Sequence, residues 1–350
     1  MVTRDTLLIL RLGSIGDTVV ALPCFHAIAR FYPNYRRVLL TNQSVSTRTS
    51  SALSVLGGSG LVDDVAHYPV GGLNFGQARR LLAEIRRLRP VALIYLVERP
   101  RFAPVLRDWL FLKAAGVPKV IGLPWSRDLR NCRTDPATGE LEHEAYRVGR
   151  TLQRYMPIEF GKEYWGLRFS RAELEVVDRL LGQPSKHEML VAVAPGTKLA
   201  AKDWGRNHWA ELLNKIADDY RHVRLVLLGA AEERSLCVDL ALLWKGPVSN
   251  ACGALTPRES AAALARCRVL ICHDSGPMHL AASQGTPCVA LFGNHNRPRR
   301  WYPFGENHRV IYEARGIHQI SVSQVIQEIH EALGAASGSH GLRPAVGSHY

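Results

Sequence analysis

The chain has 350 residues and carries 44 lysines and arginines against 31 acidic residues, a formal net charge of +13. Its hydrophobic fraction of 47% and charged fraction of 21% are typical of a folded globular protein and exclude an intrinsically disordered chain. The longest apolar runs have the length of β-strands, far short of the roughly 20 residues that a membrane-spanning helix needs. The length favours two domains, each with its own core.

The basic excess is concentrated in the first half of the chain, because residues 1–165 hold 23 basic and 14 acidic residues. A basic surface can bind nucleic acid, anionic lipid headgroups or a phosphorylated small molecule, and it can also simply keep a protein soluble. The paired arginines at 79–80 and 86–87 fit the last explanation, since they alternate with leucine and isoleucine as on the wet face of an amphipathic helix. Composition does not decide among these alternatives.

The first residues lead directly into an apolar strand pattern and lack the features of a secretory signal, so a cytoplasmic location is expected. The seven cysteines are scattered singly, without a CxxC pair or a spacing typical of metal ligands. Cys24, Cys272 and Cys288 lie in apolar runs, where they are expected to be small core residues. The sequence therefore indicates neither a disulfide framework nor a zinc site.

Strand and helix patterns alternate along the first half of the chain. Strands are predicted at 6–12, 37–41, 92–97 and 119–123. A glycine loop follows the first strand, and then comes a helix with Val20, Cys24, Ala27, Ile28 and Phe31 on one side. Further helices are predicted at 77–89, 104–115 and 144–155, with a turn-rich stretch at 125–144 and a connection between domains, a candidate hinge, at 157–169.

The second half repeats this alternation after a helix at 171–182. Strands are predicted at 189–194, 223–229, 268–272 and 287–293, with helices between them. Thr256, Pro257 and Glu259 have the spacing of a capping box at a helix start. The pattern predicts an α/β protein with two doubly wound domains, at 1–160 and 161–334, and a disordered tail at 335–350.

Three loops that follow predicted strands are candidate ligand sites, because ligands of such sheets bind beyond the carboxyl ends of the strands. The loop Gly13–Asp17 places Asp17 at a helix start, where it is either an N-cap or a catalytic carboxylate. The loop Pro195–Trp204 offers a threonine and two lysines to phosphate oxygens, unless it is a solvated basic loop. The segment His273–Ala282 joins a strand to a helix through Ser-Gly, which predicts an anion site at the helix N-terminus.

Four motifs in this order resemble the bacterial heptosyltransferases of glycosyltransferase family 9. They are Gly16-Asp17 with Pro23, the loop 202–209, the turn 228–233 and the segment 274–282. The resemblance spans about residues 6–330 and implies a GT-B architecture, in which two Rossmann-like domains face each other across a cleft. It also implies transfer of heptose from an ADP-activated donor to the inner core of lipopolysaccharide, with inversion at the anomeric carbon.

The resemblance assigns roles to individual residues. Asp17 matches the catalytic base and Lys202 the lysine that stabilises the leaving diphosphate. The donor-binding candidates are Thr197, Lys198, Glu232, Asp274, Ser275, Gly276, Met278 and His279. His279 is otherwise a core or capping histidine, and Glu233 is an alternative to Glu232. The acceptor-binding candidates are Ser14, Gly16, Arg127 and Arg130. The resemblance does not assign the arginines: Arg127 and Arg130 are candidates because they lie in the loop after the predicted strand 119–123, with Arg99 and Arg101 behind them. Each of these four arginines is otherwise simply solvated.

The expected partners are a nucleotide-sugar donor, with ADP-heptose favoured, and an anionic glycolipid acceptor at the inner face of the cytoplasmic membrane. The chain is expected to be a monomer that needs no cofactor. No metal ion is expected either, because the Asp-x-Asp triplet by which many glycosyltransferases bind one does not occur. One alternative keeps the architecture but changes the donor sugar or uses a non-lipid acceptor, for which the basic turn 293–300 is a possible sign. Nucleic-acid binding is a distant alternative that only the charge favours.

Overall fold

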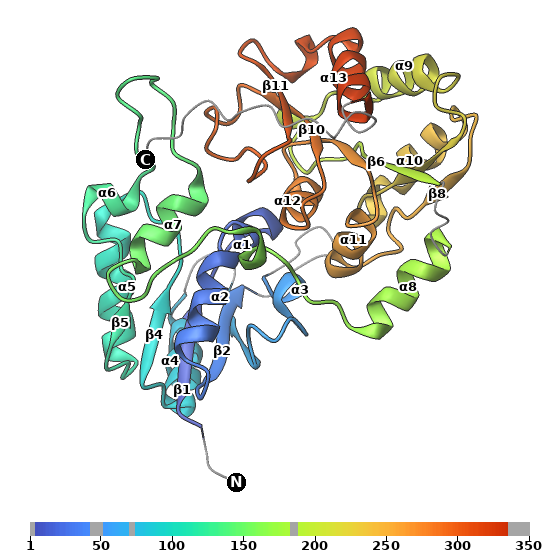
Figure 1. The fold of residues 1–350 in the computed structure, drawn as a ribbon. Helices are drawn as coiled ribbons and strands as arrows, with labels where there is room; N and C mark the ends of the chain where they lie inside the picture. Colours follow the sequence, from blue (N-terminus) through green and yellow to red (C-terminus); the bar gives the residue numbers. More distant parts are fainter. Residues whose placement is uncertain (1–3, 43–51, 70–73, 183–187, 335–350) are drawn as a thin grey trace.

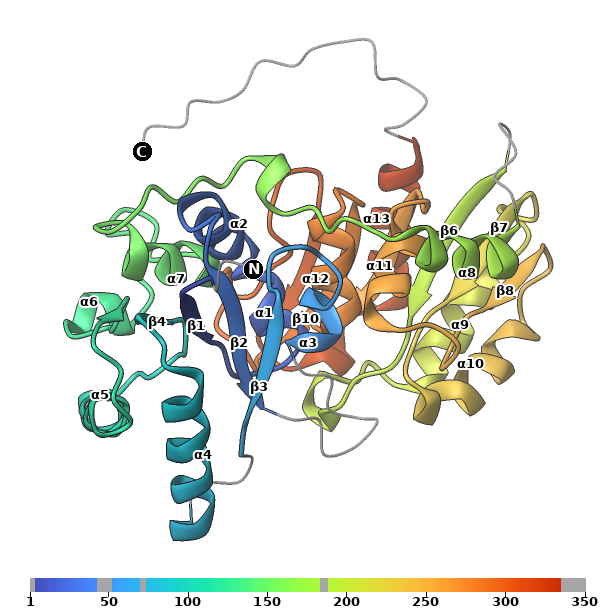
Figure 2. The ribbon, with the colours of Figure 1, turned by 90° about the horizontal axis from the view of Figure 1, so that it is seen from below.

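Two parallel β-sheets, each covered by helices, form the framework of the chain (Figures 1 and 2). The structure is a computed structural model and describes residues 4–42, 52–69, 74–182 and 188–334. The tail predicted to be disordered, 335–350, lies outside these residues. The predicted α/β class with two doubly wound units is confirmed, and the two units face each other in the GT-B arrangement.

The first sheet has the strand order β3-β2-β1-β4-β5. Its unit contains, in chain order, β1 (Thr6–Leu10), α1 (Ile15–Val19), α2 (Leu22–Phe31), β2 (Arg36–Asn42), α3 (Leu53–Leu56), β3 (Asp64–Tyr68), α4 (Phe75–Leu88), β4 (Ala92–Tyr95), α5 (Phe102–Ala114), β5 (Val120–Ile121), α6 (Arg127–Arg130) and α7 (Glu144–Leu152). Strand β1 pairs with β2 on one side and β4 on the other, so the strand order reverses beside β1.

The second sheet has the order β11-β10-β9-β6-β7-β8. After η1 (Lys162–Tyr164), which packs on α2, its unit contains α8 (Arg171–Leu181), β6 (Met189–Ala194), η2 (Ala200–Lys202), α9 (Arg206–Ile216), β7 (Val223–Leu227), η3 (Ala231–Glu233), α10 (Arg234–Ala241), β8 (Val248–Asn250), α11 (Pro257–Leu264), β9 (Val269–His273), α12 (Gly276–Ser283), β10 (Cys288–Gly293), β11 (Arg309–Glu313), η4 (Ile317–Gln319) and α13 (Val322–Gly334). Here the order reverses between β6 and β9, which pair in parallel.

The central strands are almost completely buried, as their unbroken apolar runs predict. One apolar cluster continues from the first unit into the second, so residues such as Val19 and Leu280 belong to the same core. Cys24, Cys272 and Cys288 are buried free thiols, as predicted. None of the helices in the described ranges is long and apolar enough to cross a bilayer.

Several predicted element boundaries are wrong. The single helix predicted after the glycine loop is two helices, α1 and α2, because Pro23 occupies the first turn of α2 and starts it anew. Phe31 lies 44% exposed rather than on the buried side. The helix predicted at 144–155 ends at Leu152, and that at 171–182 ends at Leu181, where Gly182 takes a positive φ of 74°. The capping box at the start of α11 is confirmed.

Candidate functional site

The two points at which the strand order reverses, beside β1 and beside β6, lie against each other through α1 and α12 (Figure 1). A Cβ atom added to Gly16 of α1 would lie 2.7 Å from Cδ2 of His279 in α12. A Cβ added to Gly276 would lie 3.3 Å from Cβ of Ile15. These glycines therefore allow close contact between the helices that follow the two reversal points, where open α/β sheets bind their ligands.

Asp17 is held at the start of α1 by a reciprocal contact with Ser14. Oδ2 of Asp17 accepts hydrogen bonds from the backbone N–H of Ser14, at 2.7 Å, and from its hydroxyl, at 2.8 Å. Ser14 is the N-cap residue and Asp17 is the third residue of the helix, so the alternative of Asp17 as N-cap is wrong. The side chain stays 27% exposed. This geometry fixes the carboxylate at the first turn and leaves it open to a ligand.

A buried arginine, Arg11, lies beneath Asp17. Its side chain is 2% exposed, and it donates hydrogen bonds to the carbonyl oxygens of Leu96 and Asp17. Its Nη2 lies 4.0 Å from Oδ1 of Asp17. Burial lowers the pKa of the Arg11 guanidinium, and the negative charge of Asp17 opposes that shift. Arg11 therefore ties the turn that carries Asp17 to the ends of β1 and β4.

On the facing unit, Lys202 and Asp274 form an ion pair. Nζ of Lys202 lies 2.6 Å from Oδ2 of Asp274, and Nδ2 of Asn296 donates to the same oxygen. Asp274 is 8% exposed. His273 connects the two loops, because its Nε2 accepts a hydrogen bond of 3.0 Å from the backbone N–H of Trp204. Burial lowers the pKa of His273 to about 4, so the ring is neutral at pH 7.

The start of α12 presents backbone donors to the same region. No side-chain cap covers this end of the helix, and Pro277 has no N–H, so the first-turn donors are the N–H groups of Gly276 and Met278. The Met278 side chain is fully buried in the core, and only its backbone faces this end. The Ser275 hydroxyl donates to the carbonyl of His273 at 3.2 Å. An anion at this point would meet N–H groups and the positive end of the helix dipole.

The remaining donor candidates lie around the loop that follows β6. Thr197 is partly exposed and Lys198 is exposed. Partial burial lowers the pKa of Lys198, against the attraction of Glu233 and Glu232. Glu232 is exposed, whereas Glu233 packs so closely on Gly196 that a Cβ there would lie 1.9 Å from its carboxyl carbon. Burial raises the pKa of Glu233.

His279 is buried, at 4% exposure, between Gly16 and the ring of Trp301. Burial lowers its pKa, while Asp274 and Asp17 raise it. His279 is therefore close enough to Asp17 of the first unit, and to Asp274 and Lys202 of the second, for the charges of all three to affect its pKa. A neutral imidazole at this point can donate or accept one hydrogen bond without adding charge to the site.

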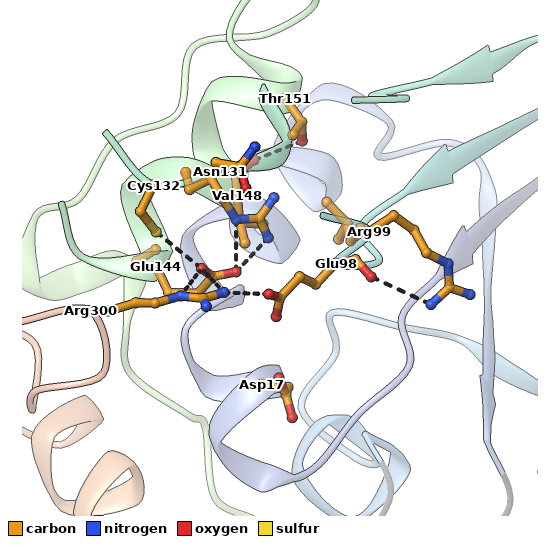
Figure 3. A network of polar contacts seen from close by, with 12 residues as sticks. Asp17, Glu98, Arg99, Asn131, Cys132, Glu144, Val148, Thr151 and Arg300 are labelled. Atoms are coloured by element: carbon orange, nitrogen blue, oxygen red, sulfur yellow. Dashed lines mark hydrogen bonds and ion pairs between the residues drawn. The ribbon is translucent and has the colours of Figure 1, made fainter. Parts of the chain in front are cut away.

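A second connection between the units is the ion network of Figure 3. Arg300, after β10, donates to Oε2 of Glu144 from Nε, at 3.1 Å, and from Nη2, at 3.0 Å, and also to Glu98. Glu144 is 1% exposed and pairs with Arg147 as well. Burial would raise the pKa of Glu144, but Arg147 and Arg300 hold it below its usual value. The basic turn 293–300 thus supplies a contact between units, and Arg299 pairs with Glu140 at 2.8 Å.

The four arginines predicted to bind the acceptor fall into two pairs, one hydrogen-bonded within the first unit and one exposed to solvent. Nε of Arg99 donates to Asp108 at 2.9 Å, and Arg101 is exposed at the start of α5. Arg127 is exposed on α6, while Arg130 donates to the carbonyl of Trp125 and covers the Phe102 ring. Arg99 and Arg130 are therefore engaged within the first unit, and Arg101 and Arg127 extend into solvent. Among the described residues, no three His, Cys, Asp or Glu side chains meet as metal ligands.

The sequence model of glycosyltransferase family 9 (heptosyltransferase) matches residues 111–329. The chain belongs to glycosyltransferase family 9. Lipopolysaccharide heptosyltransferase 2 of Escherichia coli K12 is 27% identical over 285 residues, which cover 75% of this chain and 76% of that protein. The protein of the same description from Salmonella typhimurium is 27% identical over 154 residues, so the matched region spans only 43% of its length.

Solved structures of family 9 share the fold. A glycosyltransferase from Veillonella parvula has a TM-score of 0.71 at 17% identity, over 96% of this chain and 99% of that one. ADP-heptose lipopolysaccharide heptosyltransferase II of E. coli has a TM-score of 0.67 at 19% identity, over 95% of this chain and 100% of that one. The chain is thus a family 9 glycosyltransferase with a GT-B fold.

Sequence reasoning missed four residues of this candidate site. Asn296 and Arg300 lie in the basic turn 293–300, which was interpreted as a sign of a different donor or acceptor and not as a contact with Asp274 or Glu144. Glu144 was predicted only as the first residue of a helix. The position of Arg11 at the end of a continuous apolar strand could have identified it, because an arginine is seldom buried there without a specific partner.

Proposed function

We propose that this family 9 enzyme transfers a heptose from an ADP-activated donor to an anionic lipopolysaccharide-core acceptor, in a single inverting displacement. Asp17 acts as the general base, and Lys202 with the turn Asp274–Gly276 stabilises the leaving diphosphate. The observation that carries the proposal is the contact of Gly16 with His279, which brings the turn of Asp17 against the turn of Asp274 from the opposite unit.

The base role rests on the surroundings of Asp17. In an inverting transfer the acceptor hydroxyl loses its proton as it attacks the anomeric carbon, so a carboxylate must lie on the face opposite the leaving group. Asp17 is partly exposed and belongs to the unit across from the Lys202 pair. Oδ2 of Asp17 accepts two hydrogen bonds from Ser14, which orient the carboxylate, and its side chain is open to an acceptor hydroxyl.

The leaving-group role rests on Lys202 and α12. A lysine ammonium has three donors, and the pair with Asp274 uses one of them, so two remain for phosphate oxygens. The N–H groups of Gly276 and Met278 and the helix dipole add fixed positive potential. Because these groups supply positive charge without a metal ion, we expect transfer to continue in the presence of EDTA. Loss of activity on chelation, with recovery on adding Mg²⁺, would contradict this.

The decisive experiment compares Asp17→Asn with the wild type. General-base catalysis is typically worth about 10²–10⁴-fold, so kcat should fall by roughly that factor, while calorimetry should give an unchanged Kd for ADP. Asp5→Asn, at an exposed carboxylate before β1, is the matched control and should retain full turnover. Near-normal turnover of Asp17→Asn would exclude the base role.

The donor and acceptor are tested separately. Mass spectrometry of products from a panel of nucleotide sugars, with a delipidated core oligosaccharide as acceptor, should show a mass increase of one heptose with ADP-heptose alone. Efficient transfer from another nucleotide sugar, or to a protein or metabolite acceptor only, would replace the proposed substrates while leaving the GT-B chemistry in place.

A further inference from the structure

The outer face of α5 carries a row of exposed apolar side chains. Phe102 is 47% exposed, Leu106 37% and Leu110 54%, and their spacing of four residues places them on one face of the helix. Trp125, which is 42% exposed, extends this row beyond the helix. Its ring lies 6.1 Å from that of Phe102 and 5.8 Å from that of Trp109. We name these five residues the α5 face.

Cationic side chains surround the α5 face. The guanidinium of Arg130 lies 5.5 Å from the centre of the Phe102 ring, and Arg101 and Arg127 are exposed at the ends of α5 and α6. Arg107 is 65% exposed even though it contacts the buried carboxylate of Asp108. The nearby acid Asp128 is paired with Arg133. The face therefore combines apolar side chains, an interfacial tryptophan and a net positive rim.

This combination matches the surface of an anionic bilayer. Leucine and phenylalanine enter the boundary between headgroups and acyl chains, tryptophan is enriched at that depth, and arginines bind lipid phosphates. The overall charge agrees, because the first half of the chain holds most of the basic excess.

The position of the α5 face also agrees with its proposed use. Helix α5 follows β4 and Trp125 follows β5, so the face begins at the same sheet edge as Asp17, to which Arg11 links the end of β4. An acceptor whose lipid part stays in the membrane must present its sugar near this edge. This argument from position rests on the proposed function, in which the acceptor is a glycolipid.

We propose that the α5 face is the surface through which the enzyme docks reversibly on an anionic membrane, with Phe102, Leu106, Leu110 and Trp125 in the interface and Arg101, Arg107 and Arg127 on lipid phosphates. Docking through this face holds the Asp17 edge of the first sheet beside the bilayer. The contact is peripheral, and added salt weakens it because the exposed charges are screened.

The test compares the double variant Leu106→Glu/Leu110→Glu with the wild type in vesicle co-sedimentation, without nucleotide or acceptor. The wild type should bind vesicles of phosphatidylglycerol and phosphatidylcholine, bind pure phosphatidylcholine weakly, and dissociate as salt rises. The double variant should bind the anionic vesicles at least about tenfold more weakly. Leu242→Glu, at an 81% exposed leucine after α10, is the matched control and should bind like the wild type.

Two further measurements keep the result unambiguous. Circular dichroism should give the same melting curve for all three proteins, and transfer to a delipidated, soluble acceptor should be equal, because neither leucine belongs to the catalytic site. Sedimentation velocity should show that the wild type does not self-associate through this face.

Unchanged vesicle binding by the double variant would refute the proposal. A wild-type dimer that this variant abolishes, without vesicle binding, would also refute it and assign the face to a second copy of the chain. Failure of transfer in every protein would instead refute the proposed function, and the vesicle result would still stand.

Discussion

Replacing Gly16 with alanine tests whether the contact between α1 and α12 sets the catalytic geometry. The added Cβ would lie 2.7 Å from Cδ2 of His279, about 0.7 Å closer than the 3.4 Å at which ordinary contact begins. Gly16 lies within α1 without a positive φ, so alanine is compatible with its backbone and even favours the helix. The substitution therefore acts through the His279 contact, which must widen.

Widening this contact moves Asp17 away from the proposed donor site, and a misplacement of about 1 Å can cost on the order of 10²-fold in rate. We expect kcat of Gly16→Ala to fall by roughly 10- to 100-fold. The Kd for ADP should stay within about twofold, because Lys202 and Asp274 keep their contacts. Overpacking should lower the free energy of unfolding by about 1–3 kcal/mol.

The assay is steady-state transfer to a delipidated acceptor, with ADP binding followed by calorimetry. Gly166→Ala is the matched control, because no atom lies within 4 Å of the Cβ that it would add. It should behave like the wild type. Wild-type kcat for Gly16→Ala would refute the reasoning, since it would mean that the distance between the two turns does not limit the reaction.

Three other substitutions test separate parts of the structure. Lys202→Met should weaken ADP binding by roughly 10- to 100-fold in calorimetry, because the proposed charge-assisted hydrogen bond to phosphate is lost, and unchanged affinity would exclude the proposed role of Lys202. Arg300→Leu leaves the buried Glu144 with one arginine and should lower the free energy of unfolding in urea by about 1–3 kcal/mol, whereas Arg299→Leu, at a largely exposed side chain, should not. Burial lowers the pKa of His143 to about 4, so between that value and the unfolded value of about 6.5 the unfolded chain binds more protons. The free energy of unfolding should therefore decrease as pH falls from about 6.5 to 4, by roughly 3 kcal/mol from this residue, and His143→Gln should flatten that dependence.

The parts of the fold that were predictable from the sequence are those in which local pattern and tertiary environment agree. Strands β1, β6, β9 and β10 are covered on both sides, so their sequences are continuous apolar runs. The edge strands β3, β8 and β11 were not predicted. They pair on one side only and keep partly exposed residues, which leaves no clear period in the sequence.

The candidate site divides along similar lines. Asp17, Lys202 and Asp274 lie in segments that follow predicted strands, so their chain positions predicted that they lie near the carboxyl edges of the sheets. The contact between Arg300 and Glu144 joins residues 156 positions apart and depends on how the two units pack, which no local pattern encodes. The acceptor role predicted for Arg130 stays a prediction, and the structure adds that its guanidinium donates to the Trp125 carbonyl.

The segment after β10 joins two tasks within a few residues. Asn296 donates a hydrogen bond to the carboxylate of Asp274. Arg300, four residues later, donates to Glu98 and Glu144 of the opposite unit. Exchanging this segment for that of another enzyme would therefore also change the ion pairs of Arg300 that connect the two units. A segment taken from another family 9 enzyme would therefore need acidic partners at positions 98 and 144, and a change made near Asp274 can also alter the contact between the units.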